Sequence, residues 1–131
     1  MSSKAILCVD DEVIVLLSLR QELKKTFGDT FIYEQATNAE IALEIIDELY
    51  GENIRIILII SDWLMPGMKG DEFLELVNNK HPDIKAIMIT GQADEEVLEK
   101  MEQNSYMISI MKKPWDSREL IKLIEDNCVQ V

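Results

Sequence analysis

The sequence predicts a doubly wound α/β domain, in which one parallel sheet lies between two layers of helices. Short apolar runs alternate with longer segments of helical period, and this alternation repeats five times along the chain. At least three of the runs are apolar on both faces, which is typical of parallel strands that are covered on both sides. Parallel strands need crossover connections, and the helical segments supply them. The predicted fold is therefore a single (βα)5 unit.

Each predicted strand is followed by an apolar stripe at helical spacing. The expected strands are residues 5–9, 31–34, 56–60, 84–89 and 106–111, and the stripes that follow them begin at Leu16, Ile41, Phe73, Val97 and Leu120. The run at 56–60 is entirely aliphatic and is expected to be the most buried strand. Thr37 and Glu40 have the spacing of a capping box at the start of the second helix.

The amino-acid composition limits the kinds of binding partner and the cellular compartment that are expected for the chain. The 131 residues suit one domain, expected to span 1–131, and 13 Lys+Arg against 25 Asp+Glu give a net charge of −12. This charge disfavours direct binding to nucleic acid or to an anionic membrane surface. Cys8 and Cys128 are too few for a disulfide framework, and no apolar run is long enough for a secretory leader or a membrane span. The expected location is the cytoplasm.

Polar side chains follow four of the five predicted strands. The segments at the strand ends are Asp10-Asp11-Glu12, Ser61-Asp62-Trp63, Thr90-Gly91-Gln92 and Lys112-Lys113-Pro114. In open α/β sheets the ligand site lies beyond the carboxyl ends of the strands, so these segments are expected to share one site.

The chemistry of this set favours phosphoryl transfer with Mg²⁺. Crowded carboxylates recruit a hard cation, and Mg²⁺ binds through one or two carboxylates together with phosphate oxygens. A carboxylate beside the metal can act as a nucleophile toward phosphorus, and Asp62, at the end of the most buried strand, is the predicted nucleophile. The Thr90 hydroxyl and the Lys113 ammonium are suited to hold the phosphoryl oxygens. Taken alone, the first acidic triplet could equally be a helix cap.

The combined pattern resembles the receiver domain of two-component response regulators, of the chemotaxis-regulator type. The matching pieces are Asp10-Asp11, Asp62-Trp63-Leu64-Met65-Pro66-Gly67, Thr90-Gly91 and Lys113-Pro114, in that order. The resemblance runs from Lys4 to about Asn127, so it implies a core of about 4–127. It implies a flavodoxin-like fold with strand order 2-1-3-4-5.

The resemblance also implies roles for individual residues. Asp62 is the expected phosphoacceptor, and Asp11 would bind Mg²⁺ directly while Asp10 assists through water. The backbone carbonyl of Trp63 is the expected further metal ligand. Thr90 would be the switch hydroxyl.

Lys113 is the expected counter-ion of the phosphoryl group. It is preferred over Lys112 because a trans proline turn, here at Pro114, follows the active lysine of the family. The sequence departs from many receivers at Ile110, where they often carry an aromatic switch residue, so activation is expected to depend on the loop at Thr90 and the next helix.

Two further positions, Leu64 and Gln92, resemble those that tune the lifetime of the phosphoryl group. The resemblance makes a signalling module, rather than a turnover enzyme, the leading hypothesis. Its expected partners are a histidine kinase or phosphotransfer protein as donor and an output partner that binds the surface of the fourth helix, fifth strand and fifth helix. A phosphorylation-dependent homodimer through that surface is a further expectation. Whether the receiver stands alone or belongs to a larger regulator or hybrid kinase stays open.

Three alternatives fit the sequence less well. A phosphatase of the haloacid dehalogenase type needs an acid two residues after its nucleophile, where this chain has Leu64. A receiver that works without phosphorylation does not need the complete acid set. A flavodoxin-like FMN site needs a phosphate loop rich in Ser, Thr and Gly after the first strand, where this chain has acids.

Overall fold

The structure, a computed structural model, describes residues 3–91 and 94–129. Its elements in chain order are β1 (Lys4–Val9), α1 (Val13–Phe27), the short 3-10 helix η1 (Gly28–Thr30), β2 (Ile32–Ala36), α2 (Ala39–Gly51), β3 (Arg55–Ser61), α3 (Gly70–Lys80), β4 (Lys85–Thr90), α4 (Glu95–Glu102), β5 (Met107–Lys112) and α5 (Ser117–Cys128). All strand pairs are parallel, and the sheet order is β2-β1-β3-β4-β5. The fold class and the strand order predicted from the sequence are confirmed.

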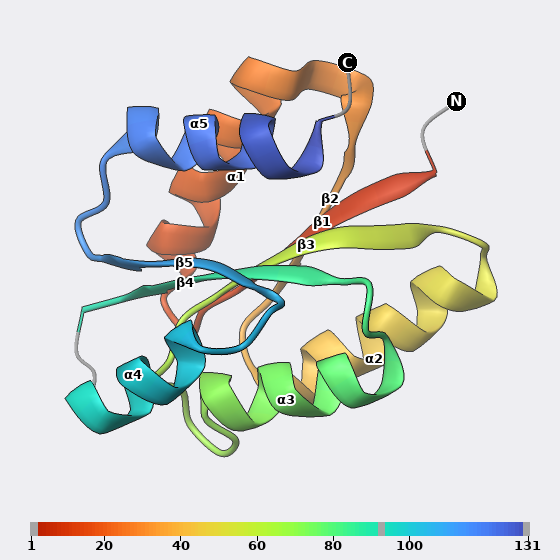
Figure 1. Cartoon of the computed structure of the whole chain (residues 1–131). Helices are drawn as coiled ribbons and strands as arrows, with labels where there is room; N and C mark the ends of the chain where they lie inside the picture. The colour runs from red at the N-terminus through yellow and green to blue at the C-terminus, as the bar shows by residue number, and fades with distance from the viewer. Residues whose placement is uncertain (1–2, 92–93, 130–131) are drawn as a thin grey trace.

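The sheet lies between two helical layers, with α1 and α5 on one face and α2, α3 and α4 on the other (Figure 1). Alternate residues of the central strands serve the two layers, as the pleat of a strand requires. Ile6, Cys8, Leu58 and Ile60 pack in the core on the α1 and α5 side, whereas Ala5, Leu7, Ile56 and Ile59 pack in the core on the other side. This two-sided burial explains why β1 and β3 are continuous apolar runs.

The second helix begins differently from the prediction. Asn38, not Thr37, is the N-cap of α2, and its side chain accepts a hydrogen bond from the Ile41 backbone N–H at 2.8 Å. The capping box was therefore placed one residue too early. Of the stripe expected to begin at Ile41, Ala42 and Leu49 are buried, whereas Ile41 itself is 40% exposed. The second strand is also displaced, to Ile32–Ala36 from the expected 31–34.

Backbone hydrogen bonds at the carboxyl ends of the strands hold the connecting loops together. The Asp10 N–H donates to the Ala36 carbonyl at 3.1 Å, and the Asp62 N–H donates to the Val9 carbonyl at 2.9 Å. The segments that follow β1 and β3 are thus fixed to their neighbouring strands. Among the described residues, no helix has the length and apolar character needed to cross a membrane.

Candidate phosphoryl-transfer site

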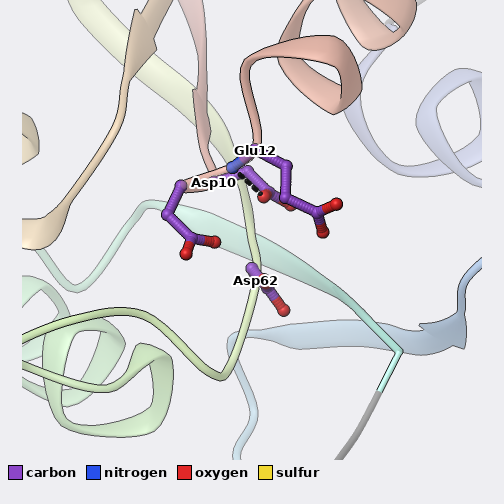
Figure 2. A group of neighbouring side chains, drawn as sticks. Asp10, Glu12 and Asp62 are labelled. Atoms are coloured by element: carbon purple, nitrogen blue, oxygen red, sulfur yellow. Dashed lines mark hydrogen bonds between the residues drawn. The ribbon is translucent and has the colours of Figure 1, made fainter.

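The polar segments predicted to meet do surround one cavity at the carboxyl edge of the sheet. The cavity has a volume of about 370 Å³ and is lined by Asp11, Glu12, Asp62, Leu64, Thr90, Gly91 and Lys113. Asp10 lies beside it, almost fully buried. One carboxylate oxygen from each of Asp10, Asp11, Glu12 and Asp62 lies within 4.8 Å of the others. Figure 2 shows three of these acids, Asp10 and Glu12 after β1 and Asp62 after β3.

Lys113 is the positive charge at the centre of this cluster. Its Nζ lies 2.8 Å from Asp10 Oδ2, 3.0 Å from Glu12 Oε1 and 3.3 Å from Asp62 Oδ2. Burial lowers the pKa of Lys113, but the hydrogen bonds and charges of the carboxylates outweigh burial and leave that pKa above its ordinary value. The lysine is therefore firmly protonated, and its three donors each face an acid.

Asp10 is the most deeply buried acid of the cluster. Its Oδ1 accepts a hydrogen bond from the Glu12 backbone N–H at 2.8 Å (dashed in Figure 2), while Oδ2 faces Lys113. Burial raises the pKa of Asp10 above its ordinary value, and the charge of Asp62 adds to this effect, although the bonds from Lys113 and the Glu12 N–H act in the opposite direction. The cluster carries more negative charge than one lysine balances.

Asp62 is held in place from both sides. Its Oδ1 accepts a hydrogen bond from the Trp63 backbone N–H at 2.8 Å, and Oδ2 faces Lys113. The side chain of Ser61 donates to the Asp62 backbone carbonyl at 2.8 Å. A Cβ at Gly70 would collide with that same carbonyl, so only glycine allows α3 to approach the turn this closely. The predicted nucleophile is thus fixed, nearly buried, and turned toward the cavity.

The carbonyl and the indole of Trp63 both contact α3. Its backbone carbonyl accepts a hydrogen bond from the Gly70 N–H at 2.7 Å, and its indole Nε1 donates to Asp71 Oδ1 at 2.8 Å. Lys69 Nζ lies 4.9 Å from the centre of the Trp63 ring. Leu64 is the residue of this turn that lines the cavity. The Trp63 carbonyl thus already has a hydrogen-bond donor, whereas the next residue, Leu64, lines the cavity.

Thr90 ends β4 and lines the same cavity. It is buried, and its backbone carbonyl accepts a hydrogen bond from the Lys113 N–H at 3.0 Å, which ties the Lys113 loop to β4. The Lys113–Pro114 peptide bond is cis, so the expected trans turn was wrong. Gln92 lies outside the described residues.

A second cavity, of about 420 Å³, adjoins the site between α4 and β5. It is lined by Thr90, Gly91, Glu95, Leu98, Glu102, Ile110 and Lys112. Ile110, which stands where many receivers carry an aromatic switch residue, is half-buried here. Tyr106, the nearest aromatic residue before it on the chain, is buried instead in the core on the α2, α3 and α4 side. Thr90 and Gly91 line both cavities, so the two cavities share the end of β4.

Two contributors to the site were not assigned from the sequence. Glu12 is the first: it belongs to the acidic triplet after the first strand, but its contact with Lys113 joins residues that are 101 positions apart. Gly70 is the second, and nothing in the local sequence pattern marks its contact with the Asp62 turn. Both omissions concern contacts that only the folded chain creates.

Comparison with known proteins decides the family. A sequence model described as the response regulator receiver domain matches residues 6–125. The chain belongs to the receiver-domain family. The receiver resembles a solved CheY-like response regulator receiver domain protein from Methanospirillum hungatei JF-1, with 32% identity, a TM-score of 0.79 and coverage of 94% of this chain and 91% of that one. Receivers are signalling domains of two-component systems, and they bind Mg²⁺ at an acidic pocket of this kind.

Longer proteins contain related segments. The receiver is 31% identical over 124 residues to the sensor kinase CckA of Brucella abortus, and 30% identical over 129 residues to the response regulator protein FleR of Pseudomonas aeruginosa. The matches cover 95% of this chain but only 12% of CckA and 24% of FleR. The similarity therefore concerns one domain of each relative.

Proposed function

We propose that this receiver, one domain spanning residues 1–131 with its core at 4–127, accepts a phosphoryl group on Asp62 in a Mg²⁺-dependent reaction. The donor would be the phosphohistidine of a histidine kinase or phosphotransfer protein, and the phosphorylated form would control an output partner. The observation that carries the proposal is the placement of Asp62, Thr90 and Lys113 around one cavity next to an acid cluster.

The donor set fits Mg²⁺, a hard cation that prefers oxygen ligands. Asp11 and Asp62 would bind it directly and Asp10 through water, with the Leu64 carbonyl replacing the expected carbonyl of Trp63. The excess of carboxylates over ammonium groups, and the raised pKa of Asp10, both favour a divalent cation here. When bound, the metal would neutralise charge on the phosphoryl oxygens.

The protein groups would position the transfer. An Asp62 carboxylate oxygen attacks phosphorus, the bond from phosphorus to the donor nitrogen breaks, and the electron pair leaves with the histidine. Lys113 already lies 3.3 Å from Asp62 Oδ2, so its ammonium can follow the charge onto the phosphoryl group. The Thr90 hydroxyl, which belongs to a residue of the same cavity, would donate a hydrogen bond to a phosphoryl oxygen.

Signal output would travel through Thr90 into the cavity between α4 and β5. Because Ile110 cannot form the polar contacts of an aromatic switch residue such as tyrosine, movement of the Thr90 loop and α4 would carry the change. The partner, or a second phosphorylated copy of this chain, would bind the surface of α4, β5 and α5. The acidic side chains Glu95 and Glu102 on this surface favour a partner with basic groups.

Intact mass spectrometry after incubation with acetyl phosphate tests the proposal. We expect one phosphoryl adduct that requires Mg²⁺ and is absent from Asp62→Asn, while Asp83→Asn, an exposed acid before β4, is labelled like the wild type. Asp62→Asn should keep its fold, because it removes one excess negative charge and preserves the side-chain volume. A Mg²⁺-dependent adduct on the Asp62→Asn protein would contradict the assignment. Absence of any adduct on the wild type would favour a receiver that acts by protein contacts alone.

A further inference from the structure

Glu12 occupies an unusual place at the start of α1. It is the N-cap residue, a position that favours short side chains able to bond the first helical N–H groups, yet its carboxylate makes no capping bond. Instead Glu12 Oε1 contacts Lys113 Nζ at 3.0 Å. The side chain has been drawn away from the local helix end toward a residue on the other side of the cavity.

Glu12 acts on Lys113 at two points. Its backbone N–H fixes Asp10 Oδ1 at 2.8 Å, which turns Asp10 Oδ2 toward the lysine. Its side chain takes one of the three ammonium donors, while Asp10 and Asp62 face the other two. Of the three acids, Glu12 is the exposed one, at 58% against 3% for Asp10 and 7% for Asp62. Its contact is therefore the one that can open at least cost.

We propose that Glu12 is a positioning residue that restrains Lys113 in the unphosphorylated receiver and competes with the incoming phosphoryl group for the lysine. This inference rests on the proposed phosphorylation of Asp62. In the reaction with acetyl phosphate, an Asp62 oxygen bonds to phosphorus, the phosphorus–oxygen bond to the acetyl group breaks, and acetate leaves with the electron pair. Lys113 must meanwhile turn toward the new phosphoryl oxygens, and the Glu12 contact opposes that movement.

Two substitutions separate the contact from the charge. Glu12→Gln removes the charge and most of the attraction to Lys113, whereas Glu12→Asp keeps the charge but is one methylene shorter. An aspartate at an N-cap also bonds readily to its own helix, which draws it further from Lys113. Both variants retain the backbone N–H that orients Asp10. Glu44→Gln, an exposed acid on α2, is the matched control for the loss of one charge.

The measurement is the rate of phosphorylation by acetyl phosphate at saturating Mg²⁺, followed by intact mass. We expect Glu12→Gln and Glu12→Asp to be labelled about two- to fivefold faster than the wild type, the range expected for loss of one exposed ion pair. Glu44→Gln should match the wild type. The gain should shrink as salt is added, because the exposed contact is screened. A role of Glu12 only in stability would change the unfolding midpoint but not this salt-dependent difference.

Other outcomes would overturn the inference. If only Glu12→Gln is faster, negative charge at the cavity mouth, and not the contact with Lys113, slows the reaction. If both variants are labelled at the wild-type rate or more slowly, Glu12 does not compete for the lysine, while labelling of the wild type leaves the proposed function intact. If the wild type takes no phosphoryl group, the proposed function fails, and this inference fails with it.

Discussion

The two edges of the central sheet differ in whether their charged and polar residues are buried or exposed. At the carboxyl edge, β1, β3 and β4 end next to Asp10, Asp62 and Thr90, all of which are buried. At the amino edge the same three strands begin with basic residues, and a cavity of about 180 Å³ is lined by Lys4, Arg55, Ile56, Ile57, Asp83, Lys85, Asn127 and Cys128. Arg55, Asp83 and Lys85 are exposed there.

This difference shows at which edge of the sheet the burial of polar groups lowers the stability of the fold. The buried polar residues of the described chain are Asp10, Ser61, Asp62 and Thr90, and all four lie at the carboxyl edge. Buried charges need partners, and here Asp10, Glu12 and Asp62 share Lys113. Exposed charges at the amino edge remain hydrated and cost little. The same substitution should therefore have very different effects at the two edges.

Glycine to alanine should give the largest contrast. Gly70→Ala places a Cβ against the backbone carbonyl of Asp62, which cannot move aside as a flexible side chain could. We expect it to lower the free energy of unfolding by about 3 kcal/mol and to slow phosphorylation, because the Asp62 turn must shift. Gly51→Ala, at the end of α2 near the amino edge, meets no atom within 4 Å and should be neutral or slightly stabilising. Urea unfolding of both variants measures the contrast.

Equal stability of the two alanine variants would show that α3 can draw back from the Asp62 turn. The close approach at Gly70 would then be a preference of the loop and not a requirement of the site. The labelling rate of Gly70→Ala would in that case stay close to that of the wild type.

The Gly70 contact also shows the limit of prediction from the sequence. The strand runs and the meeting of Asp10, Asp62, Thr90 and Lys113 follow from local apolar patterns and from the rule that parallel strands share a carboxyl edge, whereas the strand order came from the resemblance to receivers. Those features depend on the spacing of apolar residues along each segment, which the sequence shows directly. The approach of α3 to the Asp62 carbonyl depends on the path of a loop, which no local pattern encodes.

Errors in the predicted elements have a similar physical origin. Thr37 and Asn38 are both good capping residues, so the choice of Asn38 depends on where β2 ends and α2 must start. The Gly70 N–H also binds the Trp63 carbonyl, a contact that the local sequence does not mark. Both the N-cap of α2 and this contact are decided by tertiary structure.

Lysine to methionine should give a smaller contrast between the edges. Lys113→Met leaves the buried carboxylates of Asp10 and Asp62 without their cation, so we expect a loss of about 2 kcal/mol in EDTA. Lys85→Met removes an exposed lysine whose Nζ donates to the Asn127 carbonyl at 2.9 Å, and it should cost less than about 0.5 kcal/mol. Urea unfolding with and without Mg²⁺ checks this, since a bound cation should recover part of the loss only for Lys113→Met.

The two lysine variants also test whether the cluster is balanced by Lys113. A loss of similar size for both would mean that solvent, and not the ammonium, screens Asp10 and Asp62. If Mg²⁺ also narrows the difference in unfolding free energy between Lys85→Met and the wild type, metal binding outside the acid cluster is indicated.

Aspartate to asparagine should give the smallest contrast, with the opposite sign. Because the pKa of Asp10 is raised in the folded protein, there is a pH range in which Asp10 is protonated in the folded state and ionised in the unfolded state. The free energy of unfolding falls as the pH rises through this range. Asp10→Asn removes this penalty, so at pH 7 in EDTA it should raise the free energy of unfolding, by less than Lys113→Met lowers it. The amide oxygen can still accept the Glu12 N–H.

The gain from Asp10→Asn should shrink as pH is lowered, since protonation of Asp10 relieves the wild type of the same penalty. Asp83→Asn, at the amino edge, should stay within about 0.5 kcal/mol of the wild type at every pH, because Asp83 is exposed. Unfolding curves at pH 7 and pH 5 measure both differences. A loss of stability for Asp10→Asn at pH 7 would mean that its ion pair with Lys113 outweighs its burial. The carboxyl edge would then be stabilised by its charges even before a cation binds.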